Sequence, residues 1–252
     1  MKKRGYQHNY SELEPKMHDF YGRKEKALKI IAILEDYFKR YSGKKTKDLI
    51  CLDIGCSVGT ITRTIAPNFK KMVGIDIDEK ALKKARGKKD PNLTFKVDDA
   101  LNLSFKDNYF DLIICNNVYE HVADPQRLMG EIHRVLKKGG ACYFTATNKY
   151  MIVESDYRLP FLSWLPVFLA SFYLKVTKKG NYYYERPLSY IQLKRLVSGF
   201  KKYDYTIKII KDPNSFRVSH KGGRIASRFP LFVIKSLKFF IPQYFWILVK
   251  ES

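Results

Sequence analysis

The sequence predicts an α/β fold: a doubly wound, mostly parallel seven-stranded sheet with helices on both faces and an aromatic insertion or lid. Between residues 49 and 147, short apolar runs alternate with helical stretches, which is typical of a parallel sheet covered by helices. A glycine turn follows the first apolar run, where doubly wound folds bind nucleotides. Two more apolar runs near the C-terminus are expected to complete the sheet.

The predicted elements follow one another in a regular order. An amphipathic helix over 25–41 ends at Ser42-Gly43. Strands are predicted over residues 49–54, 71–76, 93–97, 110–115 and 141–146. Helices are predicted over residues 60–66, 79–88 and 125–136. Asp78 is the expected N-cap of the middle helix, and Lys137-Lys138-Gly139-Gly140 is expected to stop the last one.

After Thr147 the alternation breaks into an aromatic, proline-punctuated stretch. A helix over 190–198, a strand over 205–210, a basic helix over 225–240 and a strand over 244–249 are then predicted. The chain is therefore expected to divide into an N-terminal helical extension or lid (1–48), a Rossmann-like cofactor-binding core (49–148), an aromatic insertion or substrate lid (149–189) and a part completing the sheet (190–252).

The charge of the chain is strongly positive. The 252 residues include 47 Lys and Arg against 25 Asp and Glu, a formal net charge of +22. Residues 151–252 hold 18 of these cations and only 6 carboxylates. This balance predicts attraction to nucleic acid, an anionic membrane surface or an anionic substrate, with an ordinary solvated basic surface as the alternative.

The cysteines and the termini bear on the compartment. Four cysteines without a C-x-x-C pair favour buried free thiols in a reducing compartment. No apolar region follows the basic N-terminus, so no secretory signal is expected. The apolar stretches 159–170 and 229–249 contain prolines or lysines, which disfavours a membrane span. We expect a cytoplasmic protein, with peripheral contact at a membrane as an option.

The stretch "CLDIGCSVGT" (51–60) carries the first functional signal. Gly55 and Gly59 form a turn that lacks the third glycine of the dinucleotide fingerprint. Asp53, two residues before the turn, would repel a pyrophosphate but favour a cationic ligand. S-adenosylmethionine suits such a site because it has no phosphate and carries an ammonium and a sulfonium. Its carboxylate could meet helix-start amides near Gly59.

Two further carboxylates fall at the ends of predicted strands. Asp76 closes the second strand, where an acid can accept hydrogen bonds from both ribose hydroxyls. Asp99, before Ala100, follows the third strand, where a carboxylate can accept a hydrogen bond from the adenine amino group. Each aspartate alone could be a turn or helix-cap residue. Together with Asp53 they would line one crevice at the carboxyl ends of adjacent strands.

These segments resemble a known family. The motifs "CLDIGCSVGT", "VGIDIDEKALKKA", "VDDALNLSFKDNYFDLIICNNVYEHVADP" and "EIHRVLKKGGACYFTATN" resemble, in order, those of class I S-adenosylmethionine-dependent methyltransferases, in the branch that contains the quinone-biosynthesis enzymes. The resemblance covers about residues 49–148. It implies cofactor contacts by the following residues: Asp53, Gly55, Ser57, Gly59, Asp76, Ile77, Asp99, Ala100 and Asn116. Ser57 stands where many relatives have glycine, and we expect binding to survive this small side chain.

The reaction itself needs no obligatory acid or base, because in-line positioning of an activated methyl group supplies most of the acceleration. An oxygen nucleophile would benefit from a base, and His121 in "NNVYEHVADP" is the candidate, with Glu120 to orient or charge it. Both could instead satisfy backbone groups of that turn. Some relatives hold a metal with Glu-x-x-Glu-His, but Asn117 replaces the first ligand here, so no metal is expected.

The acceptor is predicted from the C-terminal half. The stretches "YRLPFLSWLP" and "YYERPLS" resemble insertions of family members that act on glycans or lipid-linked intermediates. Aromatic residues with a lysine rim suit a small-molecule or lipid- or glycan-linked acceptor, methylated at oxygen, or docking on an anionic membrane surface. An ordinary lid packed on the sheet is the alternative.

Three rival functions stay open. An RNA methyltransferase fits the charge, but Asn116-Asn117-Val118-Tyr119 is no Asn/Asp-Pro-Pro-Tyr/Phe motif, so nucleic acid is not favoured. A non-catalytic adaptor would need no acidic trio in the crevice. A nicotinamide-dependent oxidoreductase conflicts with the charge of Asp53.

Overall fold

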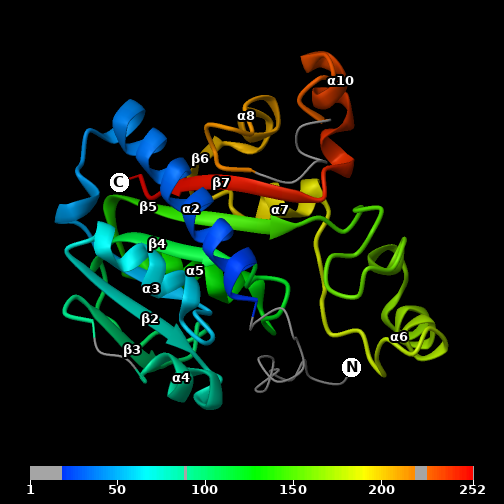
Figure 1. Cartoon of the computed structure of the whole chain (residues 1–252), viewed down its shortest axis with the longest axis horizontal. Helices are drawn as coiled ribbons and strands as arrows, with labels where there is room; N and C mark the ends of the chain where they lie inside the picture. Colours follow the sequence, from blue (N-terminus) through cyan, green and yellow to red (C-terminus); the bar gives the residue numbers. More distant parts are fainter. Residues whose placement is uncertain (1–18, 88–89, 219–225, 252) are drawn as a thin grey trace.

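A seven-stranded sheet forms the centre of the computed structural model, which describes residues 19–87, 90–218 and 226–251. The strand order is β3-β2-β1-β4-β5-β7-β6 (Figure 1). The strands are β1 (Ile50–Ile54), β2 (Lys71–Asp76), β3 (Leu93–Val97), β4 (Phe110–Asn116), β5 (Leu136–Thr147), β6 (Lys201–Asp204) and β7 (Gln243–Val249). Strands β1 to β5 are paired in parallel, and β7 pairs antiparallel with both β5 and β6. The predicted fold class is confirmed.

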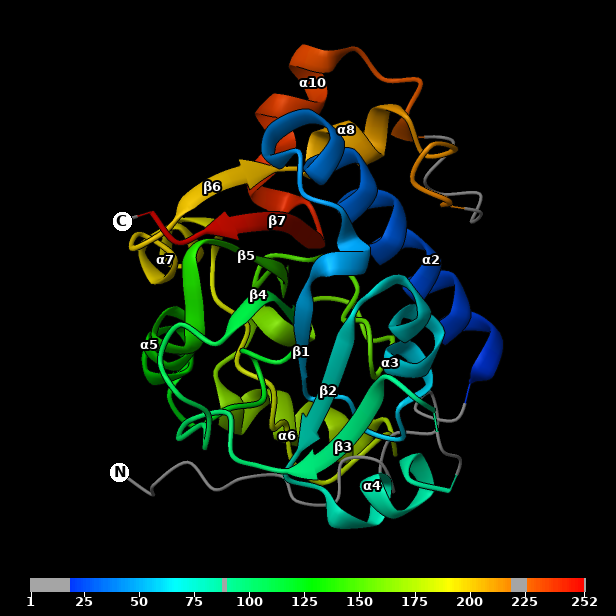
Figure 2. The same ribbon diagram turned by 90° about the vertical axis from the view of Figure 1, so that its left-hand side faces the viewer.

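Helices cover both faces of this sheet, as Figures 1 and 2 show. The helices that the structure describes are α2 (Phe20–Tyr37), α3 (Thr60–Ile65), α4 (Glu79–Ala85), α5 (Pro125–Val135), α6 (Val167–Val176), α7 (Tyr190–Leu196), α8 (Thr206–Lys211) and α10 (Leu231–Ser236), of which α6 and α10 lie beyond the sheet. Two short 3₁₀ helices, η5 (Leu162–Trp164) and η6 (Leu237–Phe240), precede α6 and follow α10.

Alternation along β1 explains the two cores. Cys51 packs into a cluster with residues of α2, α3 and α8, whereas Leu52 packs into a cluster with residues of α5 and α7. Successive side chains of a strand point to opposite faces, so an all-apolar strand needs cover on both sides. Burial on both faces explains why the strands appear in the sequence as continuous apolar runs.

Side-chain caps fix where several helices begin. Asp78 accepts a hydrogen bond from the backbone amide of Ala81 at 3.0 Å, as its position in the sequence predicted. Asp124 caps α5 in the same way, with Pro125 in the first turn. Ser189 and Gln192 form a reciprocal capping box at the start of α7.

The predicted strand over 205–210 is wrong, because residues 206–211 form α8 and the strand before it, β6, ends at Asp204. The β-branched run "TIKII" misled the prediction. A carboxylate oxygen of Asp204 accepts a hydrogen bond from the amide of Thr206 at 3.0 Å, which closes the strand. Thr206 and Ile209, three residues apart, are then buried on one side of the helix.

Three predicted boundaries also differ. Helix α5 ends at Val135 and β5 begins at the next residue, so the stretch 137–140 lies within the strand. The amide of Gly139 donates a hydrogen bond to the carbonyl of Lys250, beyond the end of β7. Pro230 precedes α10 and breaks the predicted helix over 225–240, whose residue 225 lies outside the described residues. Helix α4 ends at Ala85, and residue 88 of its predicted range is not described.

Two further properties follow from these elements. All four cysteines are buried and free. Within the described ranges, no helix is both long enough and apolar enough to cross a bilayer.

Candidate active site

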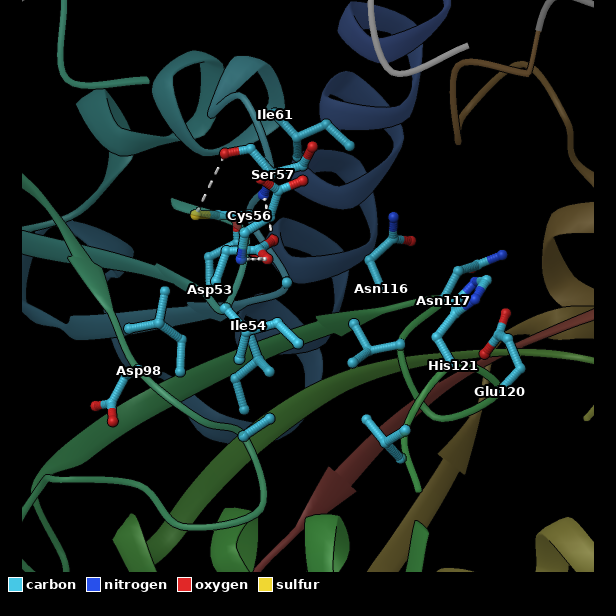
Figure 3. A pocket seen from close by; sticks show the side chains of 18 of the residues that line it. Asp53, Ile54, Cys56, Ser57, Ile61, Asp98, Asn116, Asn117, Glu120 and His121 are labelled. Atoms are coloured by element: carbon cyan, nitrogen blue, oxygen red, sulfur yellow. Dashed lines mark hydrogen bonds between the residues drawn. The ribbon is translucent and has the colours of Figure 1, made fainter. Parts of the chain in front are cut away.

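A pocket opens at the carboxyl ends of β1, β2 and β4 and beside the loop after β3 (Figure 3). Strand β1 lies between β2 and β4, and the strand order reverses at this point. The loops that follow β1 and β4 therefore run to opposite sides of the sheet and leave a crevice between them. Figure 3 shows two groups of side chains: Asp53, Cys56, Ser57 and Ile61 beside the glycine loop, and Asn116, Asn117, Glu120 and His121 after β4.

The glycine loop is held in a conformation that a side chain would disturb. Gly55 has φ +73°, and a Cβ atom added there would lie 2.8 Å from Cγ2 of Val118. Its amide donates a hydrogen bond to the carbonyl of Ile75 at 2.9 Å. Gly55 therefore allows the close approach of the loops after β1 and β4.

Gly59 is also constrained by packing, and its predicted cofactor contact stays a prediction. It has φ +75° and directly precedes α3, and an added Cβ would lie 2.6 Å from Cζ of Phe95. It does not line the pocket. This glycine is therefore required by packing of the helix start against Phe95, behind the wall of the pocket.

Asp53 is buried in that wall, with 4% of its surface exposed. Its Oδ2 atom accepts a hydrogen bond from the hydroxyl of Thr62 at 2.6 Å. Burial raises the pKa of this carboxyl to about 7, against the opposing effects of the Thr62 hydrogen bond and the charge of Arg23. Near neutral pH this group can therefore exchange a proton when a charged ligand enters.

Asp76 ties the end of β2 to the glycine loop. Its two carboxylate oxygens accept hydrogen bonds from the amides of Ser57 (2.8 Å) and Asp78 (2.9 Å). Burial raises its pKa, and these two hydrogen bonds act in the opposite direction. A carboxylate has further lone pairs, so the same oxygens can accept hydroxyl groups of a ligand.

Two adjacent acids lie in the loop after β3. Asp99 accepts a hydrogen bond from the amide of Leu101 at 2.8 Å, and Asp98 accepts one from the hydroxyl of Ser104 at 2.5 Å. Both line the pocket together with Ala100. Figure 3 shows Asp98 on the side of the pocket away from Glu120 and His121.

A polar network holds the loop after β4. The hydroxyl of Thr145 lies 2.9 Å from Oδ1 of Asn116 and 2.6 Å from Oδ1 of Asn117. Gln243 of β7 donates to the same Asn117 oxygen at 2.6 Å. Asn117 has φ +56°, a conformation that asparagine tolerates better than most residues. The network fixes both amides at the mouth of the pocket.

Glu120 and His121 follow in this loop. Glu120 is 2% exposed, and the hydroxyl of Thr147 donates to its Oε1 atom at 3.0 Å. Burial, together with the charges of Asp156 and Glu154, raises the pKa of Glu120 to about 8. His121 is half-buried and lines the pocket, and its amide donates to the carbonyl of Val118.

The pocket brings together most of the residues predicted from the sequence. The predicted residues that line it are Asp53, Gly55, Ser57, Asp76, Ile77, Asp99, Ala100, Asn116, Glu120 and His121. Their roles stay predictions. Six polar or charged lining residues were not predicted as parts of the site: Arg23, Lys26, Asp78, Asp98, Asn117 and Asp156. Arg23 and Lys26 come from α2, and no pattern distinguishes them among the many basic residues of the chain.

The charges of the lining residues limit the ligand. Seven carboxyl side chains line the pocket, against the basic side chains of Arg23 and Lys26. Such a pocket disfavours a pyrophosphate and suits a ligand that carries positive charge with a few hydroxyl groups. Among the residues that the structure describes, no three metal-binding side chains are grouped so that they could hold an ion.

Known proteins that resemble this chain are methyltransferases. The methyltransferase domain family matches residues 52–144. Phosphoethanolamine N-methyltransferase 2 of Caenorhabditis elegans is 33% identical over 110 residues, which are 42% of this chain and 25% of that protein. Ubiquinone biosynthesis O-methyltransferase of Pelagibacter ubique (strain HTCC1062) is 31% identical over 144 residues, 54% of this chain and 58% of that protein. The chain thus spans less than two thirds of the length of these relatives.

Solved structures extend the likeness to nearly the whole chain. A plantazolicin methyltransferase in complex with a monoazolic desmethylPZN analog and SAH superposes with a TM-score of 0.61, over 96% of this chain and 88% of that one. The identity is 18%, so this similarity shows a shared fold.

Proposed function

We propose that the protein transfers a methyl group from S-adenosylmethionine to a small-molecule acceptor, free or carried on a lipid or glycan, since its residues 52–144 match the methyltransferase domain family and its sheet has the order of a doubly wound fold. The observation that carries the proposal is the acidic pocket at the carboxyl ends of β1 and β2, where Asp53 and Asp76 flank the glycine loop.

The lining residues fit this cofactor. Asp76 can accept hydrogen bonds from the ribose hydroxyls, and Asp99 can accept one from the adenine amino group. Asp53 lies beside the loop that would hold the methionine end, where the ammonium of the cofactor would favour its ionised form. Arg23 supplies positive charge for the carboxylate of that end. Gly55 keeps this space open, since a Cβ atom there would collide with Val118.

The residues after β4 are proposed to position the acceptor. The bound cofactor supplies a methyl group that is already activated on a sulfonium, so the task of the protein is to hold the nucleophile in line with it. Asn117 is fixed by Thr145 and Gln243, which suits a role in positioning the acceptor, while Asn116, the last residue of β4, keeps its predicted cofactor contact. His121 is proposed to accept the proton that an acceptor hydroxyl loses as its oxygen is methylated.

The raised pKa of Glu120 refines the role of that residue. Since its pKa is raised to about 8, the Glu120 carboxyl is mainly protonated at pH 7. A protonated carboxyl neither removes a proton from the acceptor nor adds negative charge beside His121. We therefore propose that Glu120 holds the loop through Thr147 and that His121 alone acts as the base.

Methylation at an amine is the second candidate. Three further carboxyl groups lie close to Glu120. The charges of Asp156 and Glu154 raise the pKa of Glu120, and the charge of Glu120 raises the pKa of Glu185. Negative potential at this side of the pocket would attract a protonated amine. Oxygen remains our first choice, because the pocket also offers His121 as a base for a hydroxyl.

A methyl-transfer assay tests these proposals. The purified chain is incubated with methyl-labelled S-adenosylmethionine and pairs of acceptors that differ only in bearing a hydroxyl or an amine. The His121→Ala variant should lower turnover of the hydroxyl acceptor while cofactor affinity stays nearly unchanged. Unaltered turnover of this variant would reject His121 as the base, and turnover of the amine acceptor alone would favour the second candidate.

A further inference from the structure

Two segments far apart in the sequence expose large apolar side chains on one face of the protein. We define the apolar face by six aromatic residues of η5, α6, α10 and η6, with the residue that precedes η5: Phe161, Trp164, Phe168, Phe172, Phe232 and Phe240. The exposed fractions of Phe168, Phe172 and Phe232 are 71%, 65% and 71%. We propose that the apolar face docks the protein on an anionic lipid bilayer.

A ring contact joins the two segments. The indole of Trp164 and the ring of Phe240 are stacked, with their centroids 6.5 Å apart and an interplanar angle of 25°. Phe161 packs edge-on against the same indole at 5.3 Å. Figure 1 shows α6 and α10 beyond the carboxyl end of β5. The two segments therefore meet at this ring pair, while α6 and α10 lie apart on either side of it, as Figures 1 and 2 show.

Helix α6 exposes large apolar side chains to solvent. Ala170 and Leu174 are buried in the small core of the insertion, while Phe168, Phe172 and Val176 are exposed on the other side. Lys175 is the one charged residue of α6, so the helix places a mostly apolar surface in solvent. Contiguous exposed apolar surface of this extent marks a contact surface.

The apolar face is held in a fixed position beside the pocket. The side-chain amide of Asn148 donates hydrogen bonds to the carbonyls of Phe239 (2.7 Å) and Ile241 (3.0 Å), at the end of η6. Two residues later, Gln243 contacts Asn117 in the pocket wall. Docking of this face would therefore bring the mouth of the pocket to the surface of the partner.

Charge identifies an anionic bilayer as the partner. The two segments and their flanks carry Lys175, Lys178, Lys179, Arg228, Lys235 and Lys238. The sequence has no carboxylate between Asp156 and Glu185, and none between Asp212 and Glu251. Apolar side chains with a cationic rim match acyl chains below anionic headgroups.

The same charges argue against the other occupants of this face. In a symmetric dimer through this face, the cations of one copy would meet those of the other, which opposes association. Duplex nucleic acid would satisfy the cations, but its phosphate backbone would leave the exposed phenylalanines unburied. Resting on the proposed function, this docking indicates an amphiphilic acceptor that the protein draws from the bilayer.

Vesicle flotation of the full chain tests the inference. The probes are vesicles of phosphatidylcholine alone and of phosphatidylcholine mixed with phosphatidylglycerol. We expect binding to the mixed vesicles only, and weaker binding at high salt. The variant carrying Phe168→Glu, Phe172→Glu and Phe232→Glu should lose affinity by at least about tenfold, because each substitution removes apolar surface from the contact. Tyr41→Glu is the matched control, since Tyr41 is 55% exposed, follows α2 and packs against Tyr37 and Tyr203, outside the apolar face.

The outcomes separate this inference from the proposed function. No binding to anionic vesicles, or equal binding by the triple variant, would overturn the inference. A dimer that the triple variant abolishes, without vesicle binding, would assign the face to a second copy and also overturn it. S-adenosylmethionine binding is measured on the same samples: it should be unchanged in both variants, and its absence would contradict the proposed function while leaving vesicle binding to decide the docking.

Discussion

The carboxylate of Asp76 accepts a hydrogen bond from the backbone amide of Ser57, with 2.8 Å between Oδ2 and N. This bond joins the end of β2 to the glycine loop after β1. The residue proposed to bind the ribose therefore also shapes the loop that would bind the methionine end of the cofactor. Substitution of Asp76 is expected to disturb both halves of the cofactor site at once.

Ser57 should be replaceable by glycine with a gain in stability. It has φ +51°, and its buried hydroxyl oxygen has no hydrogen-bond partner among the residues that the structure describes. Relief of the left-handed strain and of the buried hydroxyl outweighs the extra flexibility of glycine, so Ser57→Gly should raise the free energy of unfolding by about 1 kcal/mol. Urea titration measures this change. A loss of stability would show that the serine side chain supports the loop.

Gly55 should not tolerate a side chain. Gly55→Ala combines a positive φ with a Cβ atom 2.8 Å from Val118, so the free energy of unfolding should fall by about 2 kcal/mol or more and cofactor affinity should fall with it. Gly130→Ala is the matched control, because Gly130 lies in α5 with nothing within 4 Å of an added Cβ. This control should gain about 0.5–1 kcal/mol. Equal behaviour of the two variants would contradict the geometry of the loop.

Glu185 should make the stability of the protein depend on pH. Burial and the charges of Asp156, Glu154 and Glu120 raise its pKa to about 8, from an ordinary value of 4.5. The folded state therefore binds the proton more tightly than the unfolded state, so this group lowers stability as pH rises from about 4.5 to about 8. Glu185→Gln should unfold like the parent protein at low pH and be more stable at pH above 8, by on the order of 3 kcal/mol.

Denaturant unfolding of both proteins across this pH range measures the difference. A constant difference between them would indicate that Glu185 ionises normally in the folded protein.

Tyr119 should be needed to hold the insertion against the core. Its hydroxyl donates to the carbonyl of Thr147 at 2.5 Å and accepts from the amide of Leu188 at 3.0 Å. Tyr119→Phe would leave both backbone groups without this partner and should cost about 1–3 kcal/mol. Hydrogen exchange should show faster exchange at Leu188 in this variant. Unchanged exchange would mean that other contacts hold the insertion in place.

Much of the fold could be predicted because its local signals agree with its tertiary structure. The strands β2 and β3 have the predicted bounds, since each is a short apolar run between turn residues. The run 206–211 failed because its β-branched residues favour a strand, whereas burial of Ile209 against the sheet and the turn at Asp204 select a helix.

The site could be predicted only where it follows the order of the chain. Asp53, Asp76 and Asp99 stand at ends of successive strands, so their proximity follows from parallel pairing alone. Arg23 reaches the pocket from α2, which packs on one face of the sheet, and Asp156 reaches it from the insertion. Their position depends on tertiary packing, which no local pattern in the sequence encodes.

Calorimetric titration with S-adenosylmethionine, S-adenosylhomocysteine and NAD tests the central claim most directly, with Asp76→Ala beside the parent chain. We expect the first two ligands to bind, NAD not to bind, and the variant to lose binding of both. Failure of the folded parent chain to bind either ligand would contradict the claim and leave an adaptor that retains the fold without its cofactor.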